Sequence, residues 1–346
     1  MPAGLPLSPL AAEKLAREAA RNSFAEAART LSLDWHLGDQ PLDGKQVQRW
    51  SERLGEALIA QRDAEVLGLA RGIHPEGPLN HPPLMVVGLD GGRVQTRDKD
   101  SRGKRQWKED KVVSLTSYLP GDGKEKKPKK LVSSYVASME DAHAFGKMVA
   151  GEASRRGQWQ APVILNISDA GSWIDPLSEL EKLADVRIID FYHAAEHLFE
   201  VAGAIEGNQT PEAQERGQWL EGLLYNGKVG EVIAWLRQQA EPLGPPQETD
   251  GPKHPREVLR QNLGYFEKHQ QCMQYDVYRS HGWPIGSGNV EAGVKGFNKR
   301  VKGTDQFWNK PGVEAILALR AMWMSQDQRW ERYWTHRPAY GFAQAA

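Results

Sequence analysis

The sequence predicts a mixed α/β fold in which a helical insertion interrupts the sheet and a helical region comes first. Apolar residues at helical spacing fill residues 10–72, and short strand-like runs alternate with helical patterns between residues 84 and 191. From residue 192 to residue 279 the patterns are helical and no strand is evident. This stretch is too long for one connection, so we expect an insertion over about residues 194–280.

Residues 1–75 are expected to form an N-terminal helical domain. A first helix is predicted over Ala11–Arg21, and Ser23 and Asp43 are candidate caps for helices over Ser23–Leu31 and Lys45–Ala70. Short helices joined by turns suit a helix-turn-helix, which can read DNA. A helical packing module is an equally good interpretation of the same pattern.

The proline-rich segment HPEGPLNHPP marks a boundary, and the predicted α/β domain follows over residues 76–346. The first strand ends at Asp90, Gly91 and Gly92 supply a turn, and a later strand ends at Asp169. Residues at such strand ends gather at the active sites of open α/β sheets. The predicted strands are 84–90, 93–97, 111–119, 162–169 and 186–191, with helices before and after the fourth.

Composition limits the possible classes of protein. The chain has 346 residues, 40% of hydrophobic type, which is enough for a large core. Its 44 Lys and Arg balance 45 Asp and Glu, so DNA binding would require local clusters of positive charge. Cys272 is the only cysteine, which excludes internal disulfides and fits a reducing, cytoplasmic setting. We expect neither a signal peptide nor a membrane span, because the apolar runs are too short.

Three carboxylates form the candidate catalytic set. Asp90 and Asp169 end strands, and Glu291 lies in the first turn of a helix that Ser287 or Asn289 could cap. Taken singly, each acid is better explained as a turn former, a cap or a helix-dipole residue. Together, two carboxylates on strands and one on a helix suit two Mg²⁺ ions and phosphodiester cleavage. We therefore expect the three to lie within about 4–8 Å of one another.

A basic helix follows Glu291. Between Ala292 and Gly303 the sequence has no acidic residue, and the positive charges suit a phosphate backbone. Solvated surface side chains are the alternative interpretation. The candidate DNA-binding residues are Lys295, Lys299, Arg300 and Lys302.

The segments VVGLDGG, NISDAGSWI, DFYHAAEHL, PIGSGNVEAGVKGFNKRVKG and WERYW resemble the bacterial insertion-sequence transposases of the Kra type, relatives of the Mutator-like DDE transposases. The resemblance runs from about residue 10 to residue 335, and PIGSGNVE is its most specific part. It implies an RNase H-like core with a helical insertion before the glutamate. It also implies that Asp90, Asp169 and Glu291 are the catalytic triad and bind two Mg²⁺ ions, with Mn²⁺ as a substitute.

The resemblance implies two auxiliary residues as well. Mutator-type enzymes have an Asp or Cys shortly before a His, and Asp190 and His193 match that pattern. A histidine satisfied at a helix start explains His193 comparably well. His193 and His197 have the i, i+4 spacing of metal ligands beside Glu196, but without a third ligand of known position we do not favour zinc.

Two departures from the family pattern affect the functional prediction. Kra-type proteins commonly have Asp-Gly-Ala where this chain has Asp169-Ala170-Gly171, and the Cys-rich zinc module of many relatives is missing. We expect a transposase that binds terminal inverted repeats in double-stranded DNA, as a homodimer or higher oligomer, in the bacterial cytoplasm at the nucleoid. The alternatives are a truncated or domesticated DNA-binding copy without transposition activity, and an RNase H-like nuclease without strand transfer.

A second basic patch lies between Arg97 and Lys130. It contains twelve Lys and Arg against six Asp and Glu. Such a patch would engage DNA without sequence preference. A charged, solvated hairpin loop is an equally good interpretation.

Overall fold

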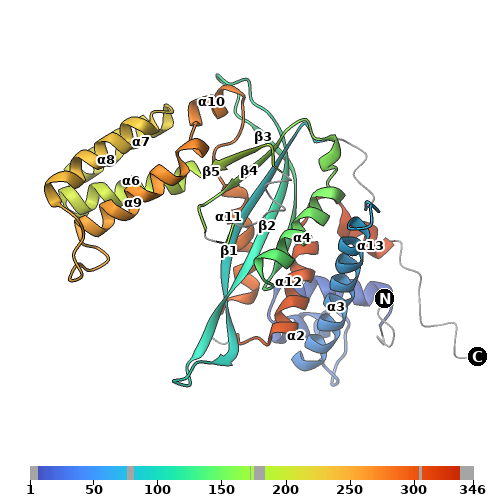
Figure 1. Ribbon diagram of the computed structural model, residues 1–346. Coiled ribbons are helices and arrows are strands. Elements are labelled where there is room, and N and C mark those ends of the chain that lie inside the picture. Colours follow the sequence, from blue (N-terminus) through green and yellow to red (C-terminus); the bar gives the residue numbers. More distant parts are fainter. Residues whose placement is uncertain (1–6, 76–81, 172, 175–183, 304–305, 336–346) are drawn as a thin grey trace, which may run out of the picture.

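The computed structural model describes residues 7–75, 82–171, 173–174, 184–303 and 306–335. Its centre is a five-stranded sheet with the order β3-β2-β1-β4-β5. β2 is antiparallel to β1 and β3, whereas β4 is parallel to β1 and β5. This order and these directions are those of an RNase H-like core, which confirms the predicted fold class (Figure 1). The strands are β1 (Leu84–Lys99), β2 (Arg105–Leu119), β3 (Lys129–Ser138), β4 (Ile164–Ser168) and β5 (Val186–Ile189).

The first two predicted strands are in fact one strand, β1. The prediction of a turn at Gly91 and Gly92 is wrong, because Gly92 pairs with Asp110 inside the β1–β2 ladder. A Cβ added to Gly92 would lie 2.6 Å from a carboxylate oxygen of Asp110, so this glycine permits close approach and does not make a turn. The turn lies at residues 100–104, where Gly103 has a φ of +76°. The third predicted strand, 111–119, lies within β2. The strand β3 was not predicted.

The helices follow the predicted pattern closely. Ser23 caps α2 with a reciprocal capping box to Glu26, as the sequence indicates. Much of the helical stretch predicted between β4 and β5 lies outside the described residues. Apart from the four helices that form the body of the insertion, the described residues form α1 (Pro9–Arg21), α2 (Phe24–Asp34), α3 (Gly44–Leu69), α4 (Ala142–Arg155), α10 (Tyr275–Ser280), α11 (Gly288–Val301), α12 (Lys310–Met324) and α13 (Arg329–Thr335).

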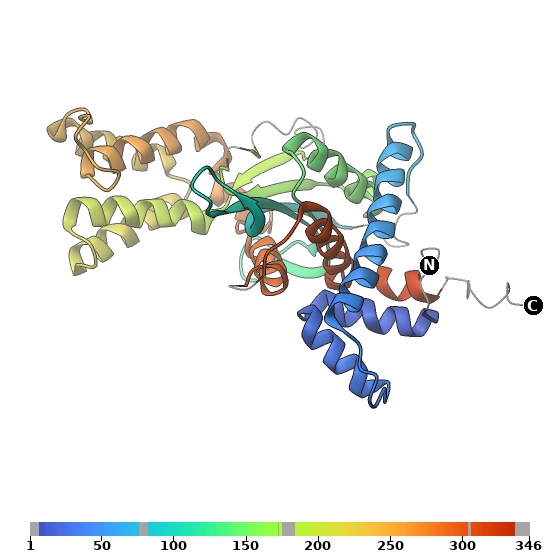
Figure 2. The same cartoon turned by 90° about the horizontal axis from the view of Figure 1, so that it is seen from below.

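The body of the predicted insertion is a group of four helices beside the sheet, followed by the short helix α10 (Figures 1 and 2). Its amphipathic helices bury leucines and a phenylalanine between them, and this cluster continues into β4 and β5 through Leu165 and Ile188. The insertion therefore packs on the parallel edge of the sheet. Its helices are α6 (Phe191–Glu206), α7 (Pro211–Tyr225), α8 (Val229–Leu243) and α9 (Pro255–His269).

The N-terminal helices share one apolar cluster with the C-terminal helices. Leu15 of α1 and Leu54 of α3 are buried in the same cluster as Phe297 of α11 and Ile316 of α12. Gly55 lets α3 approach the backbone of α12 closely, because an added Cβ would collide with Ala315. A division into domains at residue 75 stays a prediction. Within the described part of the chain, no helix is long and apolar enough to cross a membrane.

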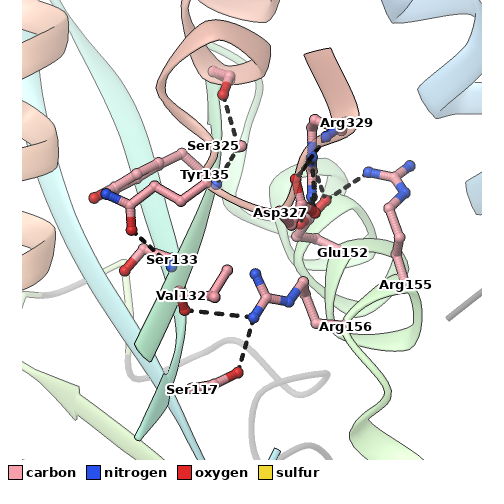
Figure 3. A network of polar contacts seen from close by, with 12 residues as sticks. Ser117, Val132, Ser133, Tyr135, Glu152, Arg155, Arg156, Ser325, Asp327 and Arg329 are labelled. Atoms are coloured by element: carbon pink, nitrogen blue, oxygen red, sulfur yellow. Dashed lines mark hydrogen bonds and ion pairs between the residues drawn. The ribbon is translucent and has the colours of Figure 1, made fainter. Parts of the chain in front are cut away.

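A buried ionic network joins α4 to the loop between α12 and α13 (Figure 3). Arg329 pairs with Glu152 and with Asp327. Beside this network, Arg156 donates to Ser117 Oγ at 2.8 Å, which joins the end of α4 to β2. Because Glu152 is 2% exposed, its charge depends on these partners.

Removing one partner of this network should destabilise the fold strongly. We expect Arg329→Met to lower the free energy of unfolding by about 3–5 kcal/mol, because it removes the guanidinium that pairs with Asp327 and leaves the buried Glu152 with Arg155 as its remaining ion-pair partner among the described residues. Urea denaturation measures this change. Arg237→Met breaks an exposed pair with Glu267 and should cost less than about 1 kcal/mol. Equal losses in the two variants would contradict the structural role of the buried network.

Candidate active site

Asp90 and Asp169 come from neighbouring parallel strands. β1 pairs with β4 from Met85 to Leu89, and the last pair joins Leu89 to Ser168. Asp90 and Asp169 are the next residues on the two chains, and adjacent strands lie about 4.8 Å apart. Asp90 lies inside β1 and not at its end, contrary to the prediction. The two acids nevertheless stand at the level where the parallel pairing stops.

Glu291 reaches the sheet on helix α11. Val290 packs against β1 at Gly88, where an added Cβ would lie 3.1 Å from the Val290 side chain. This contact fixes the first turn of α11, which contains Glu291, against the strand that carries Asp90. Ser287 Oγ donates to the Glu291 carboxylate at 3.2 Å, and Lys295 pairs with it at 3.6 Å.

The electrostatics of Asp90 link the three acids. Burial, together with the charges of Asp169 and Glu291, raises the pKa of Asp90 to about 6 against the lowering effect of the Gly91 N–H. The charge of His193 also acts on Asp90, in the opposite direction to the acids. Residues that are far apart in the sequence therefore contribute to one negative field.

The donor chemistry of these acids fits a divalent cation, because Mg²⁺ takes carboxylate oxygens and a cation would relieve their repulsion. In the described part of the chain, however, no three His, Cys, Asp or Glu side chains are grouped so as to hold a metal ion. Glu291 is instead engaged by Ser287 and Lys295. The triad as a ligand set, with carboxylates about 4–8 Å apart, therefore stays a prediction.

Asp190 connects the insertion to α11. Its carboxylate is 1% exposed and accepts the His193 N–H at 2.9 Å and the Ser287 N–H. The Phe191 N–H donates to the Ile285 carbonyl at 3.0 Å alongside. One carboxylate therefore caps α6 and holds the residue that precedes α11.

The two predicted histidines have different surroundings. His197 Nδ1 lies 2.7 Å from Asn262 Oδ1 and its ring stacks on Tyr265, and burial lowers its pKa. The His193 side chain is 42% exposed and lies 3.6 Å from Glu196. His193 therefore points away from the apolar core of the insertion, and it is the histidine whose charge acts on Asp90.

The predicted DNA-binding residues lie on two faces of α11. Lys295 and Lys299 are exposed at the i, i+4 spacing of one outer face, and Lys302, also exposed, follows the last residue of the helix. Arg300 is 1% exposed, and its Nε donates to the Ala19 carbonyl at 2.6 Å. The prediction of a phosphate contact by Arg300 is therefore wrong. Helical periodicity puts Arg300 on the inner face of α11, where it joins α11 to α1.

The sequence pattern did not reveal Asp110. This residue of β2 is 0% exposed, and neither carboxylate oxygen has a hydrogen-bond partner among the described residues. Burial, together with the charges of Glu109 and Asp90, raises its pKa to about 6. The available signal was Gly92, the cross-strand partner whose missing side chain makes room for the carboxylate.

No family model and no curated protein matches the chain. Among solved structures, it is similar to a chain of the Drosophila P element transposase strand transfer complex. The identity is 10% and the TM-score is 0.39, over 92% of this chain and 93% of that chain. The fold assignment rests on the order and direction of the strands, and the candidate site rests on its own residues.

The raised pKa of Asp110 should make the stability of the protein depend on pH. An acid whose pKa rises on folding favours the folded state most below its unfolded pKa of about 4, and this contribution is lost as the pH rises through 6. Relative to Asp110→Asn, we expect the parent to lose about 2–3 kcal/mol of unfolding free energy between pH 4 and pH 7. Urea denaturation at each pH, in EDTA, measures the difference.

Asp122→Asn is the control for this series. Asp122 is exposed, and the N–H groups of Lys124 and Lys126 lower its pKa. Its contribution has the opposite sign, because it appears as the pH rises. A pH-independent difference between Asp110→Asn and the parent would contradict the raised pKa of Asp110.

Asp190→Ala should loosen two segments at once. We expect faster amide hydrogen exchange at His193 and Ser287, because both N–H groups lose their acceptor. Asp141→Ala removes the exposed cap of α4, which accepts the Ala144 N–H at 2.8 Å, and should affect α4 alone. Unchanged exchange at Ser287 in Asp190→Ala would rule out the connection to α11.

Proposed function

We propose that this protein is a DNA transposase of a bacterial insertion sequence, which binds terminal inverted repeats and catalyses metal-dependent cleavage and strand transfer. The observation that carries the proposal is the placement of Asp90 and Asp169 at the level where two neighbouring parallel strands of an RNase H-like sheet stop pairing, with Glu291 in the helix turn that packs on the strand of Asp90. Folding alone requires no such crowding of like charges, which raises the free energy of the ionised state. A site that handles phosphodiesters with divalent cations accounts for it.

The proposed roles follow from the positions of the side chains. Two Mg²⁺ ions, or Mn²⁺ in their place, would activate the attacking oxygen and stabilise the leaving one. Asp90, Asp169 and Glu291 would hold the ions. The exposed Lys295 and Lys299 would position phosphates along the outer face of α11. Asp190 would hold the start of α11 so that Glu291 stays near the sheet.

The partners follow from the same proposal. The substrate would be double-stranded DNA that carries the terminal repeats and then the target, bound by a homodimer or higher oligomer. The reaction would take place in the bacterial cytoplasm, at the nucleoid. The candidate His193 would act near the scissile phosphate, since its side chain is partly exposed and its charge acts on Asp90.

Glu291→Gln tests the enzymatic part of the proposal. The substitution keeps the size of the side chain and removes a negative charge that a divalent ion requires. We expect Mg²⁺-dependent cleavage of DNA that carries the ends of the element to fall by several orders of magnitude. Binding of the same DNA should be equal or slightly tighter, because one acidic repulsion is gone. Gel assays of cleavage and fluorescence anisotropy measure the two quantities.

Glu212→Gln is the matched control, because Glu212 lies in the first turn of α7 and is exposed. It should leave cleavage unchanged. Cleavage by Glu291→Gln at the parental rate would eliminate the proposed triad. A parent protein that binds the repeats but does not cut them with Mg²⁺ or Mn²⁺ would favour a domesticated DNA-binding descendant.

A further inference from the structure

The long hairpin of β1 and β2 extends beyond the rest of the sheet (Figure 1). β1 pairs with β4 only as far as Leu89, and β2 pairs with β3 only from Lys111 onward. Residues 90–99 and 105–110 are thus paired mainly with each other, and with their turn we call them the ribbon. At about 3.3 Å per residue, Lys99 at the tip lies up to about 30 Å from Asp90.

The ribbon is fixed to the body of the protein on one edge. The Trp308 N–H donates to the Gln95 carbonyl at 3.1 Å, and the Arg97 N–H donates to the Trp308 carbonyl at 2.8 Å. Trp308 is buried, and its indole N–H donates to the Val301 carbonyl at the end of α11 at 2.9 Å. These contacts hold the ribbon against the C-terminal end of α11.

Apart from Asp90 and the buried Asp110, the acidic residues of the ribbon are engaged within it or at its base. Asp98 pairs with Lys108, and Glu109 pairs with Lys111 at 3.7 Å. Asp100 holds the turn by accepting two backbone N–H groups. The tip cations are exposed, and among the described residues no ion pair joins them to an acid. These tip cations are Lys99, Arg102 and Lys104.

Aromatic side chains alternate with cations along the same surface. Trp107 is 46% exposed, and the Lys302 ammonium lies 5.7 Å from the centre of its ring. The Arg105 guanidinium lies 3.3 Å from the ring centre of Phe307. Lys302 follows α11 directly, so the ribbon surface continues the outer basic face of that helix. Along α11, Glu291 and Lys302 are separated by about 16 Å.

We propose that the ribbon is a second contact with duplex DNA, in addition to the outer face of α11. It binds the DNA that flanks the cleaved bond, at a distance from the catalytic carboxylates. This inference rests on the proposed function. A two-stranded ribbon fits the major groove of B-DNA, and its cations can reach phosphates on both sides. The rise of the strand and of α11 places the contact about 16–30 Å from the acids, which corresponds to about 5–9 base pairs.

The basic patch between Arg97 and Lys130 also includes a loop after β2, and this loop provides a matched comparison with the ribbon tip. The loop at residues 120–128 is equally rich in lysine but joins the far end of β2, about 45 Å from the ribbon tip. It lies against the segment after α10, where the Gly121 N–H donates to the Gly282 carbonyl at 2.8 Å. The basic patch read from the sequence is thus two surfaces, and the inference assigns the flank contact to the ribbon.

The experiment compares two triple variants that remove the same charge. Lys99→Ala/Arg102→Ala/Lys104→Ala changes the tip, and Lys124→Ala/Lys126→Ala/Lys127→Ala changes the loop. Binding to a fluorescein-labelled random-sequence DNA duplex is measured by anisotropy in EDTA at several salt concentrations. We expect the tip variant to bind at least about tenfold more weakly, with a log–log salt slope smaller by about 2–3, and the loop variant to match the parent.

Trp107→Ala separates the contribution of the aromatic surface to DNA binding from the contribution of the positive charges. It should weaken binding while leaving the salt slope unchanged, because it removes an aromatic surface and no charge. Circular dichroism confirms that each variant is folded. Equal weakening by the tip and loop variants, or parental binding by the tip variant, would overturn the inference and leave the proposed function intact. A parent that fails to bind the duplex at low salt would overturn both.

Discussion

Two backbone N–H groups donate to the Asp190 carboxylate, and the candidate site depends on that pair of hydrogen bonds. One comes from the first turn of the insertion and the other from the residue before α11. The insertion separates β5 from α11 by almost a hundred residues, and Asp190 returns the chain to the sheet at the level of Asp90 and Asp169. Besides this connection, the start of α11 is joined to the strands by the contact of Val290 with Gly88 and by the hydrogen bond from Asn289 to the Tyr118 hydroxyl.

Much of this arrangement could be predicted from local sequence. Caps such as Ser23 and the period of the insertion helices are local signals, and they gave the helices and the fold class. The strands were harder to predict. Glycine pairs such as Gly91-Gly92 are typical of turns, but Gly92 lies inside a strand and leaves space for the carboxylate of Asp110 on the neighbouring strand. Which residue lies opposite a glycine depends on strand register, and no local pattern contains that information.

The site residues divide in the same way. Asp90, Asp169 and Glu291 could be proposed from the sequence because phosphodiester cleavage with two Mg²⁺ ions requires a set of carboxylates. Their convergence as metal ligands is a question of side-chain geometry that sequence does not answer. Arg300 was misassigned because composition does not distinguish the two faces of a basic helix, whereas the apolar period of Val290, Val294 and Phe297 does.

The clustering of the first and last helices in one core has a consequence for how the chain matures. Arg300 and Arg320 donate to carbonyl groups at the end of α1, and Trp330 donates to Glu13. During synthesis, the part of α1 that packs against α12 and α13 therefore stays uncovered until those helices have left the ribosome. A chain that ended before α12 would lack both this cover and the helix that packs against α11.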